Sequence, residues 1–87
     1  MFKIGTFYKC FEFPKYQELK DGLRDHCIKR QIKGTIILTP EGINATVSSD
    51  KDKALEDLNL YLNNLVSELE FRFSYSNSSP FKRLKIK

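Results

Sequence analysis

Residues 34–48 read Gly-Thr-Ile-Ile-Leu-Thr-Pro-Glu-Gly-Ile-Asn-Ala-Thr-Val-Ser, and this stretch decides the fold. The apolar run at 36–38 is typical of a buried strand, and apolar residues at 43, 45 and 47 alternate with polar ones, as along a strand with one buried face. Pro40, Glu41 and Gly42 stand between the two runs, where Pro and Gly favour a chain reversal. The stretch therefore predicts a β-hairpin, and Gly42 is expected to take a positive φ in its turn.

Strand patterns also occur at both ends of the chain. Aromatic and β-branched residues at 6–13 predict a strand covered on both faces or nearly so, with Tyr8 and Cys10 opposite Phe7. Strict alternation predicts a further strand over 68–75, and a short terminal strand over 81–87.

Two segments instead have apolar residues at helical spacing. The first helix is expected over 14–30, with Pro14 in its first turn, and the second over 50–66. Ser49 and Asp52 resemble a capping box at the start of the second helix.

The element order β-α-β-β-α-β plus a short terminal strand predicts an α+β fold of the ferredoxin-like βαββαβ sandwich class. Two helices cannot cover both faces of a four-stranded sheet, so we expect a four-stranded antiparallel sheet with both helices on one face. Right-handed crossovers and a self-paired hairpin give the strand order 4-1-3-2.

Composition limits the class of protein. The chain has 87 residues, of which 40% are hydrophobic and 30% charged, so one domain over residues 1–87 is expected. Cys10, Cys27 and His26 have the spacing of neither a zinc site nor a disulfide framework, so we predict buried, reduced thiols, no metal and no cofactor. With no signal peptide and no long apolar run, the sequence predicts a soluble, cytoplasmic protein without a membrane partner.

The hairpin sequence, with Phe7-Tyr8-Lys9 before it and residues 79–85 (Ser-Pro-Phe-Lys-Arg-Leu-Lys) after it, resembles the N-terminal domain of the rhodanese-related tRNA uridine hydroxylase family. The family pattern joins Lys-Gly-Thr-Ile-Leu-Leu to Glu-Gly-Ile-Asn-Gly-Thr, and residues 33–38 and 41–46 supply it here, with Ala45 in place of the second Gly. The motif residues at the turn are Glu41, Gly42, Asn44 and Thr46.

The resemblance implies an accessory domain of an oxygen-dependent enzyme that forms 5-hydroxyuridine at the tRNA wobble position. The rhodanese domain that carries the active-site cysteine loop in such proteins is absent from these 87 residues. We therefore expect no catalytic residue in this chain, although the parent protein would be an oxidoreductase, and we expect the isolated domain to be a monomer. Neither cysteine lies in a Gly-rich or basic loop that would lower its pKa.

Other candidate sites are weaker. Acylphosphatases share this fold and hold phosphate with an Arg in the loop after the first strand, but the loop here reads Glu-Phe-Pro-Lys. His26 is expected to be a solvated or half-buried imidazole, and the aromatic residues at 71, 73 and 75 to pack in the core rather than stack on RNA bases. Glu41 fits a backbone-bonding or partner-contacting role and a solvated turn position equally well.

Two hypotheses about function follow. In the favoured one, six basic residues position tRNA phosphates while the rhodanese domain does the chemistry; these are Lys9, Lys33, Lys82, Arg83, Lys85 and Lys87. In the alternative, the open sheet face is a scaffold that docks the rhodanese domain without touching RNA. Whether the six side chains converge on one face of the fold separates the two.

Overall fold

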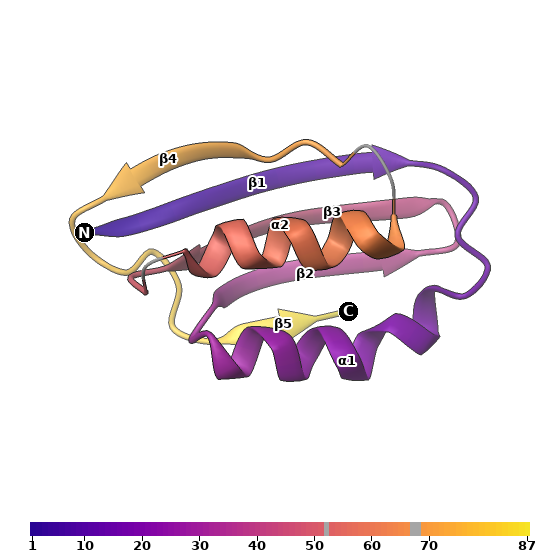
Figure 1. The fold of residues 1–87 in the computed structure, drawn as a ribbon, viewed down its shortest axis with the longest axis horizontal. Coiled ribbons are helices and arrows are strands. Elements are labelled where there is room, and N and C mark those ends of the chain that lie inside the picture. The colour runs from indigo at the N-terminus through magenta and orange to yellow at the C-terminus, as the bar shows by residue number, and fades with distance from the viewer. Residues whose placement is uncertain (52, 67–68) are drawn as a thin grey trace.

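The computed structural model describes residues 1–51, 53–66 and 69–87. The elements are β1 (Phe2–Cys10), α1 (Tyr16–Lys29), β2 (Lys33–Thr39), β3 (Gly42–Ser49), α2 (Ala54–Leu65), β4 (Arg72–Ser76) and β5 (Leu84–Ile86). Figure 1 shows both helices on the same side of one sheet, which leaves the other face of the sheet without a helix. The α+β class and the one-sided helix layer are therefore confirmed.

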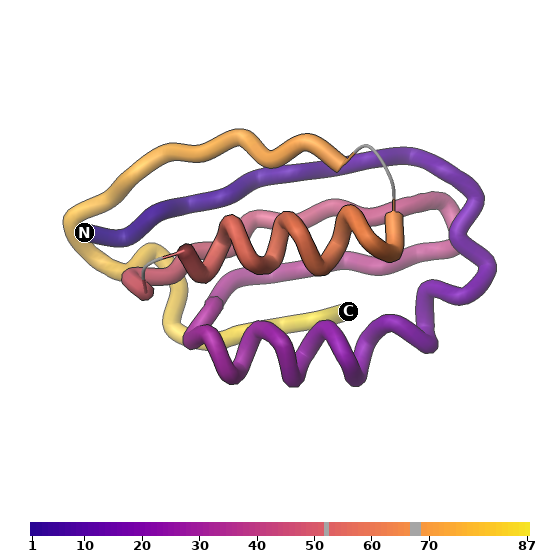
Figure 2. The backbone as a smooth tube through the Cα atoms, viewed as in Figure 1, coloured from indigo at the N-terminus to yellow at the C-terminus, as the bar shows by residue number. Residues whose placement is uncertain are grey.

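The sheet has five strands in the order β4-β1-β3-β2-β5, so the predicted order 4-1-3-2 is correct for the first four. The prediction of a purely antiparallel four-stranded sheet is wrong, because β5 joins the edge and pairs parallel with β2. The backbone trace in Figure 2 follows β5 along β2 to the C-terminus. The last residue continues the ladder, since the Lys87 N–H donates to the Ile36 carbonyl at 2.9 Å and the Lys87 carbonyl accepts the Leu38 N–H at 2.8 Å.

Several element boundaries differ from the sequence prediction. The first strand begins at Phe2 and ends at Cys10 rather than spanning 6–13, because Phe2 pairs with β4 and residues 3–6 pair with both β3 and β4. The fourth strand begins at Arg72, and the helices are shorter at both ends than predicted. The proposed capping box includes Asp52, which lies outside the described residues; Lys53 caps α2 in a left-handed conformation without a side-chain hydrogen bond.

The core lies between the helices and the sheet face that they cover. Leu23 and Cys27 of α1 and Leu58 and Leu62 of α2 are completely buried there. These helix side chains pack against buried side chains at alternate positions of the strands, which are Phe7, Ile36, Leu38, Ile43, Ala45 and Val47. At about 25 cal/mol per Å² of apolar surface removed from water, this one-sided layer is the main stabilising element of the domain.

The β2–β3 turn confirms the expectation for Gly42, whose φ is +145°. A Cβ at Gly42 would contact the Lys9 carbonyl of β1, so the position requires Gly for space as well as for conformation. Gly34, with φ +130°, is held in the same way against the backbone of Thr46, which the sequence did not predict. Both glycines let β3 lie close to its neighbours.

Candidate nucleic-acid interface

The sheet face opposite the helices carries alternating residues of all five strands. The cross-strand partners of Thr6 are Thr46 on β3 and Arg72 on β4, and Thr46 in turn pairs with Thr35, which pairs with Lys85. Because directly paired residues project to the same side of a sheet, these five side chains form one line across the open face, from Arg72 at one edge to Lys85 at the other. We call this line the threonine row.

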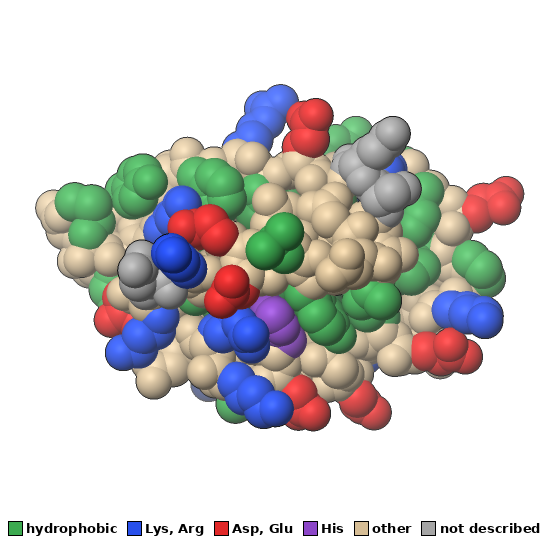
Figure 3. Space-filling view, in the orientation of Figure 1, with side chains coloured by type: hydrophobic (Ala, Val, Ile, Leu, Met, Phe, Trp, Pro, Cys, Tyr) green, Lys and Arg blue, Asp and Glu red, His purple; other side chains and the backbone are tan. Residues whose placement is uncertain are grey.

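The strands contain no carboxylate. None of the residues of β1 to β5, all of which the structure describes, is Asp or Glu, whereas the open face has Lys33, Lys85 and Arg72. Described carboxylates in the connections border this face: Glu41 in the β2–β3 turn, Glu70 just before β4, and Asp50 after β3, which lines a cavity together with Lys33. The helix side differs, since Figure 3 shows Lys and Arg side chains interspersed with Asp and Glu over it. The charged side chains that the strands place on the open face are therefore all cations.

Four of the six predicted RNA-contacting residues come together on this face. Leu84 and Ile86 pair with the buried positions of β2, so the alternation of β5 places Arg83, Lys85 and Lys87 on the open side beside Lys33. The Gly34 N–H donates to the Arg83 carbonyl at 3.0 Å, which fixes the start of this segment against β2. We call Lys33, Arg83, Lys85 and Lys87 the basic strip.

The other two predicted residues are placed differently. Lys82 lines a groove of about 360 Å³ together with Arg83, Lys85, Thr35 and two residues of the preceding loop, so it borders the basic strip. Lys9 pairs with the buried Ile43 of β3, and the alternation of β1 puts it on the helix side with Phe7. Lys9 is therefore not brought together with the other five.

The end of α1 positions the first residue of the strip. Gln31 has a left-handed φ of 53°, and the Ile32 N–H donates to the Cys27 carbonyl at 2.9 Å. Ile32 is buried, so the turn is anchored in the core before β2 begins at Lys33. This turn ends α1 and leads directly into β2, so that the Lys33 side chain lies on the open face.

The family-motif turn is built mainly by its backbone. The Glu41 N–H donates to Thr39 Oγ1 at 3.1 Å, and the Glu41 carbonyl accepts the Phe11 N–H at 3.0 Å. The Glu41 side chain is exposed, whereas Asn44 and Thr46 lie on the open face beside β1. The motif therefore positions two polar side chains on the same face as the basic strip.

The aromatic residues of the fourth strand face the helices. The Phe71 ring stacks on Phe7 with centroids 4.2 Å apart, and Lys3 Nζ lies 4.2 Å from the centroid of the Phe73 ring. Phe71 therefore packs against the core, as predicted, but Phe73 and Tyr75 are 40% and 63% exposed at the sheet edge. On the open face, the aromatic side chain of Tyr8 on β1 is 69% exposed.

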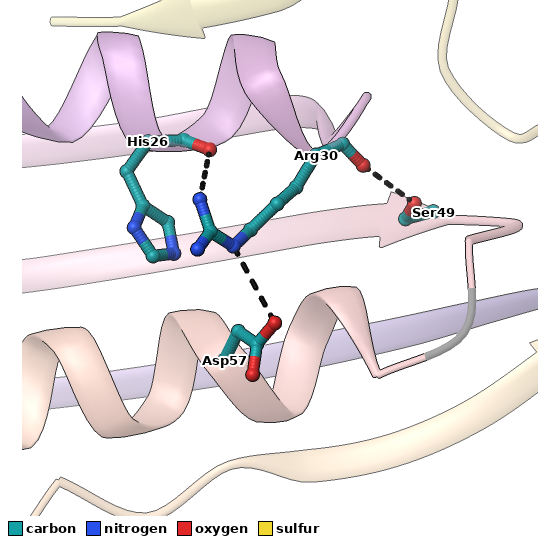
Figure 4. Close-up of polar contacts among 4 residues, drawn as sticks. All are labelled: His26, Arg30, Ser49 and Asp57. Atoms are coloured by element: carbon teal, nitrogen blue, oxygen red, sulfur yellow. Dashed lines mark hydrogen bonds and ion pairs between the residues drawn. The ribbon is translucent and has the colours of Figure 1, made fainter.

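A polar cluster joins the two helices on the covered side (Figure 4). Arg30 Nη1 donates to the His26 carbonyl at 3.4 Å, Arg30 Nε lies 3.5 Å from Asp57 Oδ2, and Ser49 Oγ donates to the Arg30 carbonyl at 3.2 Å. The Arg30–Asp57 distance is long, and both side chains are partly exposed, so the pair contributes under about 1 kcal/mol. The cluster is an inter-helix contact.

His26 is half-buried, as predicted, and its ring stacks on Tyr61 at 4.4 Å. Burial, and then the neighbouring Arg30 charge, lower the pKa of His26, while Asp57 raises it by less. Among the described residues no three His, Cys, Asp or Glu side chains are grouped as metal ligands would be. Within the same limits, no helix is long and apolar enough to cross a membrane.

The two cysteines differ. Cys27 is buried, and burial raises its pKa to about 12, which makes it a poor nucleophile. The prediction of a buried thiol is wrong for Cys10, which is exposed because the first strand is open on one face rather than covered on both.

Sequence reasoning missed Arg72, Tyr8 and the threonines of β1 and β2 as candidate surface residues. A signal for them was present in the sequence, because no segment that forms a strand contains Asp or Glu. Hydrophobic alternation predicts the buried positions, but which of the residues between them lie side by side depends on how the strands pair.

Comparisons with known proteins identify the family of the chain. Residues 2–87 match the family described as the UPF0176 acylphosphatase like domain. The chain is 33% identical over 86 residues to a protein of Ehrlichia chaffeensis named tRNA uridine(34) hydroxylase, with 97% of this chain and 31% of that protein covered. It is 38% identical to the protein of the same name from Teredinibacter turnerae, over 97% of this chain and 26% of that protein.

Among solved structures, an acylphosphatase from Coxiella burnetii superposes with a TM-score of 0.71 over 98% of this chain and 90% of that one. The sequence identity is 9%, so this likeness concerns the fold alone. The chain spans less than a third of the length of the two hydroxylases. Its match over residues 2–87, together with these relatives, shows that the chain belongs to the family of UPF0176 acylphosphatase-like domains.

Proposed function

We propose that this domain is the tRNA-positioning part of an enzyme that hydroxylates the wobble uridine of tRNA. Relatives named tRNA uridine(34) hydroxylase supply the reaction and the substrate class. We assign the oxidation to the part of such proteins that this chain does not span, and we propose that this part is a rhodanese domain. The domain itself acts in the cytoplasm, without metal or cofactor, and is a monomer when isolated.

The observation that carries this proposal is the basic strip on a sheet face whose strands contain no carboxylate. Lysine and arginine side chains aligned along one edge suit the phosphate backbone, which they contact without reading sequence. Binding should therefore be weak, similar for different tRNAs and dependent on salt.

The salt dependence can be estimated. With about four phosphate contacts, one for each residue of the strip, and a slope near −0.9 per contact, raising salt from about 50 to about 200 mM weakens binding on the order of 10²-fold. Electrophoretic mobility or fluorescence anisotropy with labelled tRNA measures this slope directly.

A charge-reversed pair of variants tests which face is used. Lys33→Glu, Arg83→Glu and Lys85→Glu together reverse three of the four charges of the strip, and we expect them to abolish binding at low salt. Lys15→Glu, Arg24→Glu and Lys29→Glu change three exposed residues at or in α1 instead. Each set moves the formal net charge from +4 to −2, because each reversal subtracts two, so the control separates position from total charge.

Equal losses in the two triple variants, or no binding of tRNA to the wild type at low salt, would contradict the proposal. The second result would favour the alternative in which the open face docks the rhodanese domain of the parent protein and touches no RNA.

A further inference from the structure

Tyr8 stands out on the open face. It lies on β1 two residues beyond Thr6, the last residue of β1 that pairs with β4, and its side chain is 69% exposed, whereas its neighbour Phe7 on the other face is 2% exposed. Its cross-strand partner is Asn44, and Asn44 pairs in turn with Ile37, which is 38% exposed. An aromatic ring, an amide and an aliphatic side chain therefore form a line next to the threonine row.

The surface is hollowed on both sides of Tyr8. On one side Tyr8, Asn44 and Ile37 line a shallow cavity of about 260 Å³, which reaches the β2–β3 turn. On the other side Tyr8 and Thr6 line a second cavity of about 360 Å³ with Glu70 and Arg72. The Tyr8 ring thus has open space beside it, and the same cavities contain both hydrogen-bond donors and hydrogen-bond acceptors.

We propose that Tyr8 stacks on an unpaired base of a single-stranded RNA segment whose phosphates lie along the basic strip. The inference rests on the function proposed above and adds to it a contact with a base. Aromatic side chains on an open sheet provide stacking surfaces for bases of any sequence, since every base has a π-face. The Asn44 side chain both donates and accepts hydrogen bonds, so it suits the edge of a base held on Tyr8.

The spacing of the strands fits a strand of RNA that crosses the sheet. Three inter-strand steps separate β1 from β5, or about 14 Å at about 4.8 Å per step. The hydroxyls of Thr46 and Thr35 fill the interval between Tyr8 and Lys85. They offer hydrogen bonds to ribose 2′-hydroxyls or phosphate oxygens along that path.

Charge favours RNA over a protein as the occupant of this face. Cations stand at both edges of the threonine row, Arg72 on β4 and Lys85 on β5, and no carboxylate lies in the strands between them. The cores of protein–protein interfaces are depleted in charged residues, whereas nucleic-acid surfaces combine basic side chains with exposed aromatic ones.

Two matched RNA probes test the stacking contact in the 87-residue chain. One is a labelled octamer of uridine, and the other has the same phosphates but abasic sugars at its four central positions. We expect the wild type to bind the uridine octamer about 5- to 150-fold more tightly than the abasic one, which corresponds to one stacked base. Both affinities should have similar salt slopes, because the phosphates are shared.

Three variants locate the effect. Tyr8→Leu keeps an apolar side chain and should reduce the uridine affinity to that of the abasic probe, while Tyr8→Phe should retain the difference. Tyr75→Leu is the control, since Tyr75 is also a strongly exposed tyrosine but lies on the helix side of the edge strand. Circular dichroism and the melting temperature confirm that each variant is folded.

Equal binding of the two octamers to the wild type, with the salt dependence intact, would overturn the stacking contact and leave phosphate binding by the strip in place. A loss of preference in Tyr75→Leu but not in Tyr8→Leu would overturn it as well. Failure of both octamers to bind at about 50 mM salt would contradict both proposals. It would favour the alternative in which the open face binds a protein partner.

Discussion

The two faces of the sheet are made from the same strands and differ in almost every property. The covered face presents apolar residues such as Phe7, Ile36 and Val47 to the helices, while the residues between them present hydroxyl, amide and basic groups to solvent. Because side chains alternate with a period of two, a single strand carries a stabilising set and a surface set. The comparison shows that stability and the candidate binding surface are separable by substitution, one residue at a time.

The largest expected contrast is chemical and concerns the two thiols. Cys27 on the covered side has a pKa of about 12, so at pH 8 only about one thiol in 10⁴ is ionised and burial also blocks the reagent. Cys10 is exposed and can be reached directly. We expect iodoacetamide to modify Cys10 in the native protein and to modify Cys27 at least about 10³-fold more slowly. Mass spectrometry of the intact chain measures the two rates. Similar rates for the two would show that the core opens readily.

Truncation on the two faces should give a comparable contrast in stability. Leu58→Ala removes a completely buried side chain between α2 and the sheet and should cost about 2–5 kcal/mol. Thr46→Ala, at the centre of the open face, should cost under about 1 kcal/mol, because it loses strand propensity but no buried contact. Urea denaturation of both variants measures the difference, and equal midpoints would mean that the open face is covered in solution.

The turn that joins β2 and β3 gives a smaller effect. Gly42→Ala should destabilise the domain by about 1–3 kcal/mol, since its φ of +145° strains other residues and a Cβ meets the Lys9 carbonyl. Gly22→Ala is the matched control at an exposed position of α1, where the new Cβ lies 2.9 Å from Tyr61 Oη at the end of a side chain that can shift. Gly22→Ala should change stability by at most about 1 kcal/mol, and a larger loss there than at Gly42 would contradict the account.

The smallest expected effect is the pH response of His26. Burial and Arg30 lower its pKa in the folded state, so as pH falls below about 6.5 the unfolded chain takes up the proton first. Folding stability is then lost as pH falls from there toward the lowered pKa. His26→Gln should reduce the fall in melting temperature between pH 7 and pH 5.5, as measured by calorimetry. An unchanged pH profile would show that the imidazole is fully solvated.

Local patterns predicted the covered face well, because hydrophobic periodicity records which residues are buried. They identified both helices, the hairpin and the order of the first four strands, and the alternation around Phe7 also places Lys9 on the covered face. The position of β5 depends on a long-range choice, its parallel pairing with β2, which no local pattern encodes. The start of β1 at Phe2 likewise depends on two partner strands.

The candidate surface was less predictable for the same physical reason. Arg72 and Lys85 are 13 residues apart in sequence and become the two ends of one row only through the register of five strands. Lys33, Arg83 and Lys85 were identified as basic residues, but their common face required the pairing of β5 with β2.

Nuclear magnetic resonance of the labelled domain, titrated with tRNA at low salt, tests the division between the two faces most directly. We predict that the largest chemical-shift changes occur in the threonine row, Tyr8 and the basic strip. The amide chemical shifts of α1 and α2 should not change. Shift changes centred on the helices, with Thr6, Thr35 and Thr46 unaffected, would contradict the assignment of the open face as the RNA-binding surface.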